Sequence, residues 1–198
     1  MNLDDLSLLK KNDPQDMLGQ IAGLPDQLAS AWTLGLASPL PDWPELRQVV
    51  VAGMGGSAIG ADLLAAYALP ECSLPVFVHR EYGLPAFAHG PQTLVIASSH
   101  SGNTEETLDS FDAALSRGCR LLAVCTGGEL KERARARGVP VWTFEHSGQP
   151  RAAVGFSFGL LLACLFRLAL IPNPDVELRG ALTAMRAQQE RLGTEIPL

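Results

Sequence analysis

Residues 93–107 read TLVIASSHSGNTEET, an apolar run that passes through a turn rich in hydroxyl side chains into a segment of helical character. The run TLVIA is continuously apolar, which is typical of a strand with helices on both faces of its sheet. Residues 48–60, QVVVAGMGGSAIG, have the same plan with glycines in the turn. Two strand–turn–helix units of this kind predict an α/β fold built on a parallel sheet.

The rest of the chain extends this alternation of strands and helices. The predicted strands are residues 48–52, 74–79, 93–98, 121–126 and 139–144. The segments of helical period between them are residues 57–68, 104–117 and 128–137. This order predicts a doubly wound, five-stranded, mostly parallel sheet flanked by helices.

Helical extensions are expected at both ends of this core. We expect one domain over residues 1–198, made of a helical arm (1–45, with helix from 13 to about 37), an α/β core (46–172) and a terminal segment (173–198). That last segment contains a polar helix from 175 to about 191 and then TEIPL, which resembles the start of a connection to a second domain. The apolar residues 152–171 approach the length of a membrane span. Arg167 and Ser157 argue against a span, and we expect a helix whose apolar surface is covered by a partner.

Composition excludes several classes of function. The 198 residues are 47% hydrophobic and 18% charged, which is typical of a globular protein, and the net charge of −6 disfavours binding to nucleic acid. The four cysteines and four histidines lack the spacing of a metal site, so we expect no metal or cofactor. Free thiols and the absence of a secretory signal favour the cytoplasm.

The two glycine- and hydroxyl-rich turns are the candidate binding site. In a sheet of this type, ligands bind beyond the carboxyl ends of the strands, where loops lead into helix N-termini. Hydroxyl groups, free backbone N–H groups and helix dipoles suit a phosphate monoester. Neither turn contains Lys or Arg, and no G-x-x-x-x-G-K-[ST] motif is present, which favours a small phosphorylated metabolite over a nucleoside triphosphate.

Two alternatives stay open at this point. One is purely structural, with Asn103 capping the following helix and Glu106 as its capping-box partner. The other is a dinucleotide site, because Gly53, Gly55 and Ala58 match G-x-G-x-x-[GA]. That site would use Glu81 for a ribose, or Arg80 for a 2′-phosphate in an NADP-dependent oxidoreductase.

The motifs together resemble those of a known family. GGS at 55–57 and S-x-S-G-N-T at 99–104, on successive strands, are similar to a sugar isomerase (SIS) domain. The helical arm, GMGGSAIG, SSHSGNTEET, CTGG at 125–128 and QPRAA at 149–153 occur in the order of the amino-terminal half of bifunctional phosphoglucose/phosphomannose isomerases. This resemblance implies interconversion of glucose 6-phosphate or mannose 6-phosphate with fructose 6-phosphate through a cis-enediol.

The resemblance also implies roles for individual residues. It assigns phosphate binding to the hydroxyls of a set of four side chains and to two backbone amides. These residues are Ser57, Ser99, Ser101 and Thr104 for the hydroxyls, and Gly55 and Gly56 for the amides. Arg151 matches the arginine that stabilises the enediolate.

The family's remaining catalytic groups, a glutamate base and a ring-opening histidine, lie after the first domain. The acids that follow Arg151 do not match that context, and no histidine follows His146. We therefore expect the chain to bind a hexose phosphate, and to isomerise it poorly or not at all without a second SIS domain. Separately, we expect a homodimer or pairing with a second such domain. The alternative is a non-catalytic sugar-phosphate sensor.

Overall fold

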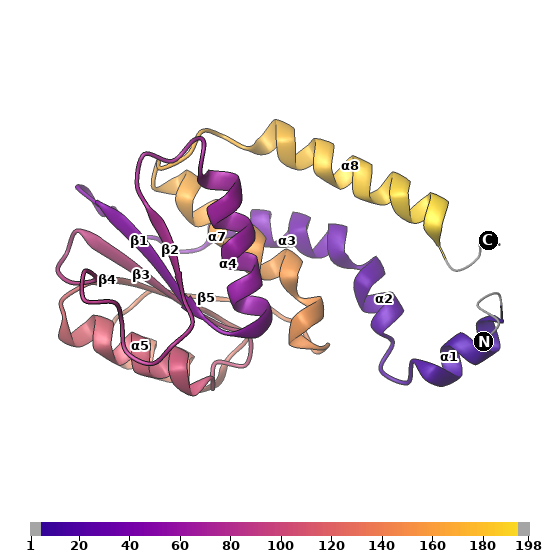
Figure 1. Ribbon diagram of the computed structural model, residues 1–198, viewed down its shortest axis with the longest axis horizontal. Coiled ribbons are helices and arrows are strands. Elements are labelled where there is room, and N and C mark those ends of the chain that lie inside the picture. Colours follow the sequence, from indigo (N-terminus) through magenta and orange to yellow (C-terminus); the bar gives the residue numbers. More distant parts are fainter. Residues whose placement is uncertain (1–4, 194–198) are drawn as a thin grey trace.

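The structure, a computed structural model, describes residues 5–193 (Figure 1). Within these residues a five-stranded sheet has the order β2-β1-β3-β4-β5, and every neighbouring pair of strands is parallel. The strands are β1 (Gln48–Gly53), β2 (Val76–His79), β3 (Thr93–Ser99), β4 (Arg120–Cys125) and β5 (Val141–Thr143). The predicted α/β class is confirmed, and each predicted strand overlaps an observed one.

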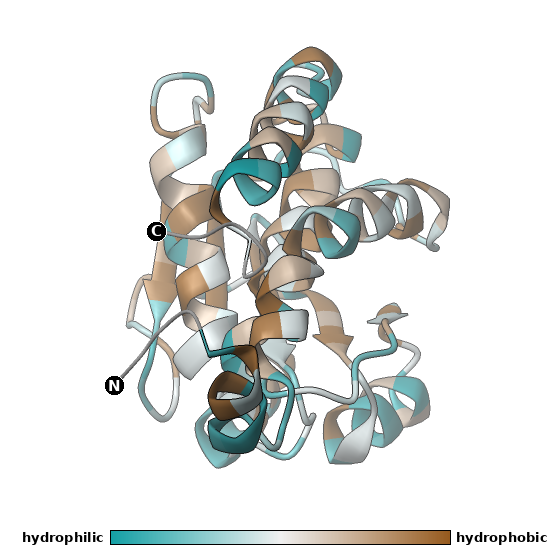
Figure 2. Ribbon diagram, turned by 90° about the vertical axis from the view of Figure 1, so that its right-hand side faces the viewer, coloured by the Kyte–Doolittle hydropathy of each residue, from teal (hydrophilic) through white to brown (hydrophobic). Residues whose placement is uncertain are grey.

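Helices cover both faces of the sheet (Figure 1). One face carries α3 (Leu24–Ala37), α4 (Gly55–Ala68) and α7 (Val154–Arg167), with α8 (Asp175–Leu192) against α3; the other carries α5 (Glu105–Ser116) and α6 (Gly128–Ala136). Strand side chains alternate between the two cores: Val49 and Val51 belong to the first, Val50 and Ala52 to the second. In Figure 2 the strands are mostly brown, and teal residues gather in the loops and on outer turns of the helices.

The arm contains three helices, because the helix predicted from residue 13 to about 37 is broken into two and a further helix precedes it. They are α1 (Leu6–Asn12), α2 (Met17–Ala22) and α3. Asp13 is the C-cap of α1, and its carboxylate accepts hydrogen bonds from the backbone N–H groups of Met17 (2.7 Å) and Leu18 (2.9 Å) at the start of α2. The arm is tied to the end of α8 by Gln189, which donates to the carbonyl of Ala22 at 2.7 Å.

The apolar helix predicted to present an exposed surface to a partner is buried inside this chain. α7 packs between α3 and α4, and its Leu160 and Leu161 are fully buried. Small residues permit the close approach: a Cβ at Gly159 would lie 2.7 Å from the Cβ of Ala31 on α3. The expectation about the surface of 152–171 is wrong, because apolar character indicates burial without identifying what covers the helix. A homodimer stays a prediction.

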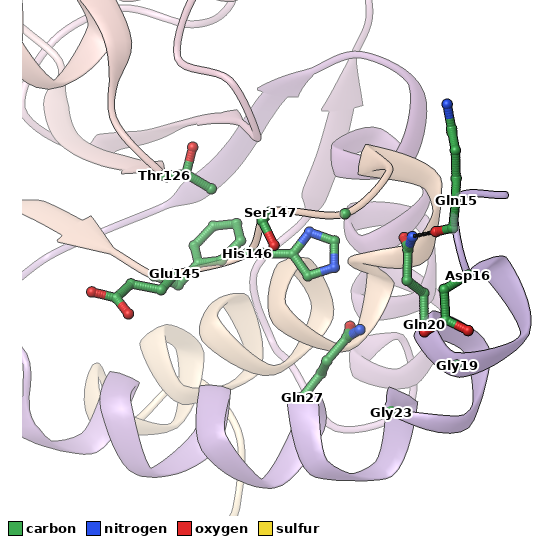
Figure 3. Close-up of a pocket in the computed structure, with 12 residues that line it drawn as sticks. Gln15, Asp16, Gly19, Gln20, Gly23, Gln27, Thr126, Glu145, His146 and Ser147 are labelled. Atoms are coloured by element: carbon green, nitrogen blue, oxygen red, sulfur yellow. Dashed lines mark hydrogen bonds between the residues drawn. The ribbon is translucent and has the colours of Figure 1, made fainter.

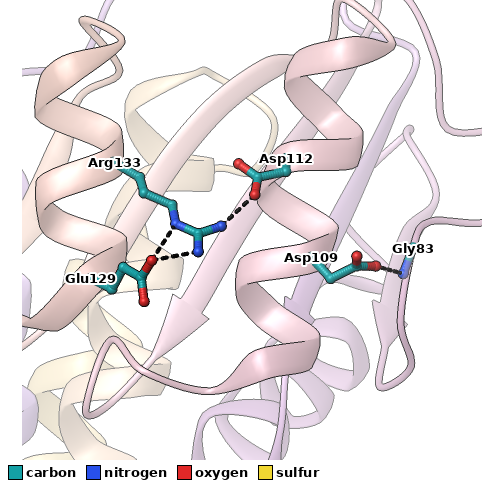
Figure 4. Close-up of polar contacts among 5 residues, drawn as sticks. All are labelled: Gly83, Asp109, Asp112, Glu129 and Arg133. Atoms are coloured by element: carbon teal, nitrogen blue, oxygen red, sulfur yellow. Dashed lines mark hydrogen bonds and ion pairs between the residues drawn. The ribbon is translucent and has the colours of Figure 1, made fainter.

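The helices on the second face are held in register by polar contacts (Figure 4). Arg133 of α6 pairs with Asp112 of α5 and donates from Nε to Glu129 at 3.0 Å. Asp109 of α5 accepts the backbone N–H of Gly83, which lies near the start of the loop that follows β2. These contacts fix the position of α5, whose first turn borders the candidate site.

Across residues 5–193, none of the helices has the length and hydrophobicity that crossing a bilayer requires. The expected connecting segment TEIPL, 194–198, lies outside the described residues.

Candidate functional site

The two predicted loops lie at the point of the sheet where the chain changes direction. β1 and β3 are neighbours, yet α4 follows β1 on one face and α5 follows β3 on the other. Because the two helices diverge from adjacent strands, a crevice forms outside the carboxyl ends of β1 and β3. The loops after these strands therefore meet at the usual ligand position of such folds.

The first loop brings three of the predicted residues into the opening turn of α4. Gly55, Gly56 and Ser57 are its first residues, and Gly55 has a φ of 48°, which favours glycine. The N-cap residue, Met54, forms no side-chain capping bond within the described part of the chain. The first N–H groups of α4 therefore face the crevice without a side-chain cap.

The second loop concentrates hydroxyl groups before α5. Ser99, only 2% exposed, shares a 2.8 Å hydrogen bond with the hydroxyl of Thr104, the N-cap residue of α5, and accepts the N–H of Gly102 at 3.0 Å. The hydroxyl of Ser101 accepts the N–H of Asn103 at 3.1 Å, and Ser101 is exposed. Three predicted hydroxyl residues thus line one short turn.

A direct hydrogen bond joins the two loops. The backbone N–H of His100 donates to the Ser57 hydroxyl at 3.2 Å. The strands also approach closely here, since a Cβ at Gly53 would lie 2.7 Å from the carbonyl oxygen of Ser98. The fold therefore brings the four predicted hydroxyl residues together at the neighbouring N-terminal ends of α4 and α5.

Arg151 lies beside the first loop. It belongs to η1 (Pro150–Ala152), which packs on α4. A Cβ at Gly56 would lie 2.6 Å from the carbonyl oxygen of Pro150 and 3.4 Å from the Cα of Arg151, so glycine is required for this contact. The Arg151 side chain is exposed, and its Cα lies beside the first turn of α4.

A third loop, after β4, locks the second loop in place. A Cβ at Gly102, whose φ is 71°, would lie 1.9 Å from the carbonyl oxygen of Gly127. Asn103 was predicted to cap its own helix, which is wrong: its Oδ1 accepts the N–H of Glu129 at 2.9 Å and thereby caps α6. Asn103 does cap a helix, but the helix is α6, which begins 25 residues later in the sequence, and not α5.

The residues required by the dinucleotide alternative are engaged elsewhere. Arg80 forms an ion pair with Asp62 of α4 and donates to the carbonyl of Ala58 at 3.4 Å, so its charge is already paired. Glu81 is exposed.

Comparison with known proteins agrees with this geometry. The chain is 41% identical over 182 residues to a bifunctional phosphoglucose/phosphomannose isomerase of Caldicellulosiruptor bescii, a match covering 91% of this chain and 53% of that protein. The chain belongs to this family. A relative of the same name from Thermoplasma acidophilum is 35% identical over 152 residues, covering 75% of this chain and 46% of the relative. The chain spans about half the length of these isomerases, and no protein-family model matches it.

Solved structures share the fold at low sequence identity. Tagatose-6-phosphate ketose/aldose isomerase from Escherichia coli aligns with a TM-score of 0.68 at 16% identity, covering 90% of this chain and 54% of that one. The Vibrio vulnificus NanR protein complexed with ManNAc-6P aligns with a TM-score of 0.58 at 18% identity, covering 93% and 74%. The phosphoglucose/phosphomannose isomerase relationship thus rests on sequence, and the SIS fold on both comparisons.

Sequence reasoning missed a contact between two histidines in this family member. The Nε2 of His100 and the Nδ1 of His146 are 2.9 Å apart, and the rings meet edge to face against Phe144 and Phe156. Burial lowers the pKa of both imidazoles, and for His100 the charge of its neighbour lowers the pKa further. We call these two residues the histidine pair. They follow β3 and β5, which only the folded sheet brings together.

A hollow of about 910 Å³ opens beside the loops of this isomerase-family chain (Figure 3). Its walls come from α2, the start of α3, Thr126 after β4 and the segment after β5 that carries His146. Thr126 donates from its hydroxyl to the carbonyl of His100 at 2.7 Å, so this wall is bonded to the second loop. The candidate phosphate groups are therefore adjacent to the hollow and do not line it.

Proposed function

We propose that this chain binds a hexose phosphate, with the phosphate held by the loops after β1 and β3. The observation that carries the proposal is the hydrogen bond from His100 to Ser57, which joins the glycine-rich tip of α4 to the hydroxyl-rich turn before α5. Ser57, Ser99, Ser101 and Thr104 would donate hydroxyl hydrogen bonds to the phosphate. Gly55 and Gly56 would donate backbone N–H groups from the uncapped first turn of α4.

The chemistry of the loops suits reversible binding of a phosphate monoester. Such a group offers three acceptor oxygens and nearly two negative charges at neutral pH, and both helix dipoles favour an anion at this position. Two carboxylates, Glu105 and Glu106, also begin α5. Glu105 accepts a 3.1 Å hydrogen bond from the Tyr82 hydroxyl. The proposed donors are neutral, so the phosphate can leave after each binding event.

We further propose that the chain is part of a phosphoglucose/phosphomannose isomerase. Aldose–ketose isomerisation moves a proton between C2 and C1. In the aldose-to-ketose direction a base removes the C2 proton, a cis-enediolate forms, the hydroxyl proton passes from O2 to O1, and a proton is returned to C1 as the C2 carbonyl forms. Arg151, held beside the α4 tip, would stabilise the enediolate oxygen by its positive charge. Because the chain spans about half of its relatives, we propose that a second SIS domain completes the reaction.

Two measurements test the proposal. Isothermal titration calorimetry with inorganic phosphate, glucose 6-phosphate and unphosphorylated glucose should show binding of the two phosphates only. Binding of glucose as tight as that of glucose 6-phosphate, or of neither phosphate, would refute phosphate recognition. A coupled assay for fructose 6-phosphate, run on this chain and on the C. bescii relative, then addresses isomerisation.

The alternative is a sugar-phosphate sensor, a role compatible with the fold shared with NanR. A sensor would bind glucose 6-phosphate and change its state of association without turnover, even after a separately expressed second domain is added. An isomerase component would gain activity on that addition. Analytical ultracentrifugation with and without ligand, alongside the coupled assay, separates the two.

A further inference from the structure

The hollow beside the phosphate loops has features that the proposed function does not use. Two of its lining residues, Thr126 and His146, are each hydrogen-bonded to His100 of the second loop. A ligand whose phosphate occupies the loops would therefore have its next atoms close to the mouth of the hollow. Residues of the helical arm form the wall of the hollow on the side away from Thr126 (Figure 3).

The lining has the chemistry that recognises hydroxyl groups. Among the described lining residues there is no Lys or Arg, whereas side-chain amides, hydroxyls and an imidazole are abundant. These are Gln15, Gln20, Gln27, Thr126, Ser147 and His146. Two carboxylates, Asp16 and Glu145, also line the hollow. Amides, hydroxyls and carboxylates together match a polyol better than an anion or an apolar ligand.

One lining residue lacks a hydrogen-bond partner. Gln27 is only 9% exposed; its Nε2 donates to the carbonyl of Ala152 at 2.8 Å, but its Oε1 has no partner among the described residues. A buried acceptor of this kind costs free energy unless a donor reaches it. Figure 3 shows the amide of Gln27 projecting from α3 toward the side where the His146 imidazole lies.

We propose that this hollow holds the hydroxyl-bearing carbon chain of the sugar phosphate, and that His146, positioned by His100, hydrogen-bonds to it. The inference rests on the proposed function, because the phosphate must first lie in the loops. Gln27 is the second contact, on the opposite wall.

The histidine pair determines what His146 offers the ligand. Burial lowers the pKa of both imidazoles and so favours their neutral forms, and two neutral rings can share one proton across the 2.9 Å contact. If His100 donates, His146 carries its own proton on Nε2 and is a donor; if His146 donates through Nδ1, its Nε2 is an acceptor. His146 therefore adapts to either a hydroxyl oxygen or a hydroxyl proton.

His146→Asn provides the test. The asparagine amide replaces the Nδ1 side of the ring, so the contact with His100 can persist, but the group corresponding to Nε2 is lost. His89→Asn is the matched control, because His89 is exposed in the loop before β3, at the opposite end of the sheet. Calorimetry with inorganic phosphate and with glucose 6-phosphate is run on the wild type and both variants, after circular dichroism has checked folding.

The expected result is selective. For His146→Asn the affinity for phosphate stays within twofold of wild type, while that for glucose 6-phosphate falls about tenfold, the effect of one lost buried hydrogen bond. His89→Asn changes neither. Unchanged glucose 6-phosphate affinity in His146→Asn, or a wild type that binds glucose 6-phosphate no more tightly than phosphate, overturns the inference alone. A wild type that binds neither ligand overturns the proposed function.

A measurement on the wild type covers the case in which the variant does not fold. Glucose 6-phosphate should shift the imidazole NMR signals of His146, and inorganic phosphate should shift them far less. Equal shifts with both ligands, or none with glucose 6-phosphate, would contradict the inference.

Discussion

Replacement of Ser57 by alanine tests the junction between the two loops. The Ser57 side chain is 8% exposed and accepts the N–H of His100 at 3.2 Å, and its own hydroxyl proton has no other acceptor among the described residues. We propose that this proton points to the ligand phosphate. Ser57→Ala removes one hydrogen bond to a charged group, worth about 1.5–3 kcal/mol. The affinity for phosphate and for glucose 6-phosphate should therefore fall by about 10- to 150-fold.

Stability provides the second half of this test. Loss of the bond to His100 should lower the free energy of unfolding by about 1 kcal/mol, which corresponds to a melting point lower by about 2–4 °C. Ser110→Ala is the matched control, because Ser110 is 1% exposed and donates to the carbonyl of Gly83 at 2.8 Å, away from the loops.

The two variants should have similar stability and different affinities. Urea unfolding gives the first quantity and calorimetry the second. Ser57→Ala that binds phosphate within twofold of wild type, or Ser110→Ala that loses as much affinity as Ser57→Ala, would refute the reasoning.

Three further predictions concern the packing and titration of the fold. Gly102→Ala should lower the free energy of unfolding by more than ~2 kcal/mol and abolish phosphate binding, because its Cβ would clash with the Gly127 carbonyl. Gly118→Ala, which has a positive φ but open space around it, should cost only about 1–2 kcal/mol in urea unfolding. An equal cost for both variants would argue against the clash. Burial raises the pKa of Cys125 to about 11 and of Cys164 to about 12, so iodoacetamide at pH 8 should leave both unmodified in the folded protein. Mass spectrometry that finds all four cysteines of the folded protein modified would contradict this. The pKa values of the histidine pair are lowered in the folded state, so the unfolded chain binds more protons below pH 6.5. The free energy of unfolding should therefore be highest above pH 6.5 and should fall as the pH drops through the lowered pKa values. Urea unfolding at pH 7.5 and 5.5 should show a weaker pH dependence for His146→Asn than for the wild type.

The sheet and its loops were predictable because their signals are local. Continuous apolar runs identify buried parallel strands, and the residues that follow them lie at the carboxyl edge whatever the strand order. For this reason Ser57, Ser99 and Thr104 could be assigned to one site from the sequence. Arg151 required the family resemblance, because nothing in the sequence indicates that Gly56 allows η1 to approach the tip of α4.

The features that were missed depend on contacts between distant segments. Two strands, β4 and β5, lie between His100 and His146 in the sequence. The two histidines meet because the strand order places the ends of β3 and β5 on either side of β4. Asn103 is of a residue type that often caps its own helix. The Gly127 turn instead brings α6 close enough for the Glu129 N–H to donate to the Asn103 side-chain oxygen. The burial of α7 likewise depends on small residues of α3, α4 and α7 that meet across the helix contacts, and the sequence of α7 alone does not identify its partners.

A crystal structure of the protein soaked with glucose 6-phosphate would test the central claim most directly. The account predicts the phosphate between the first turns of α4 and α5, within hydrogen-bonding distance of the hydroxyls of Ser57, Ser99, Ser101 and Thr104. Density for the phosphate at any other position, with these four hydroxyls making only the contacts described above, would contradict it.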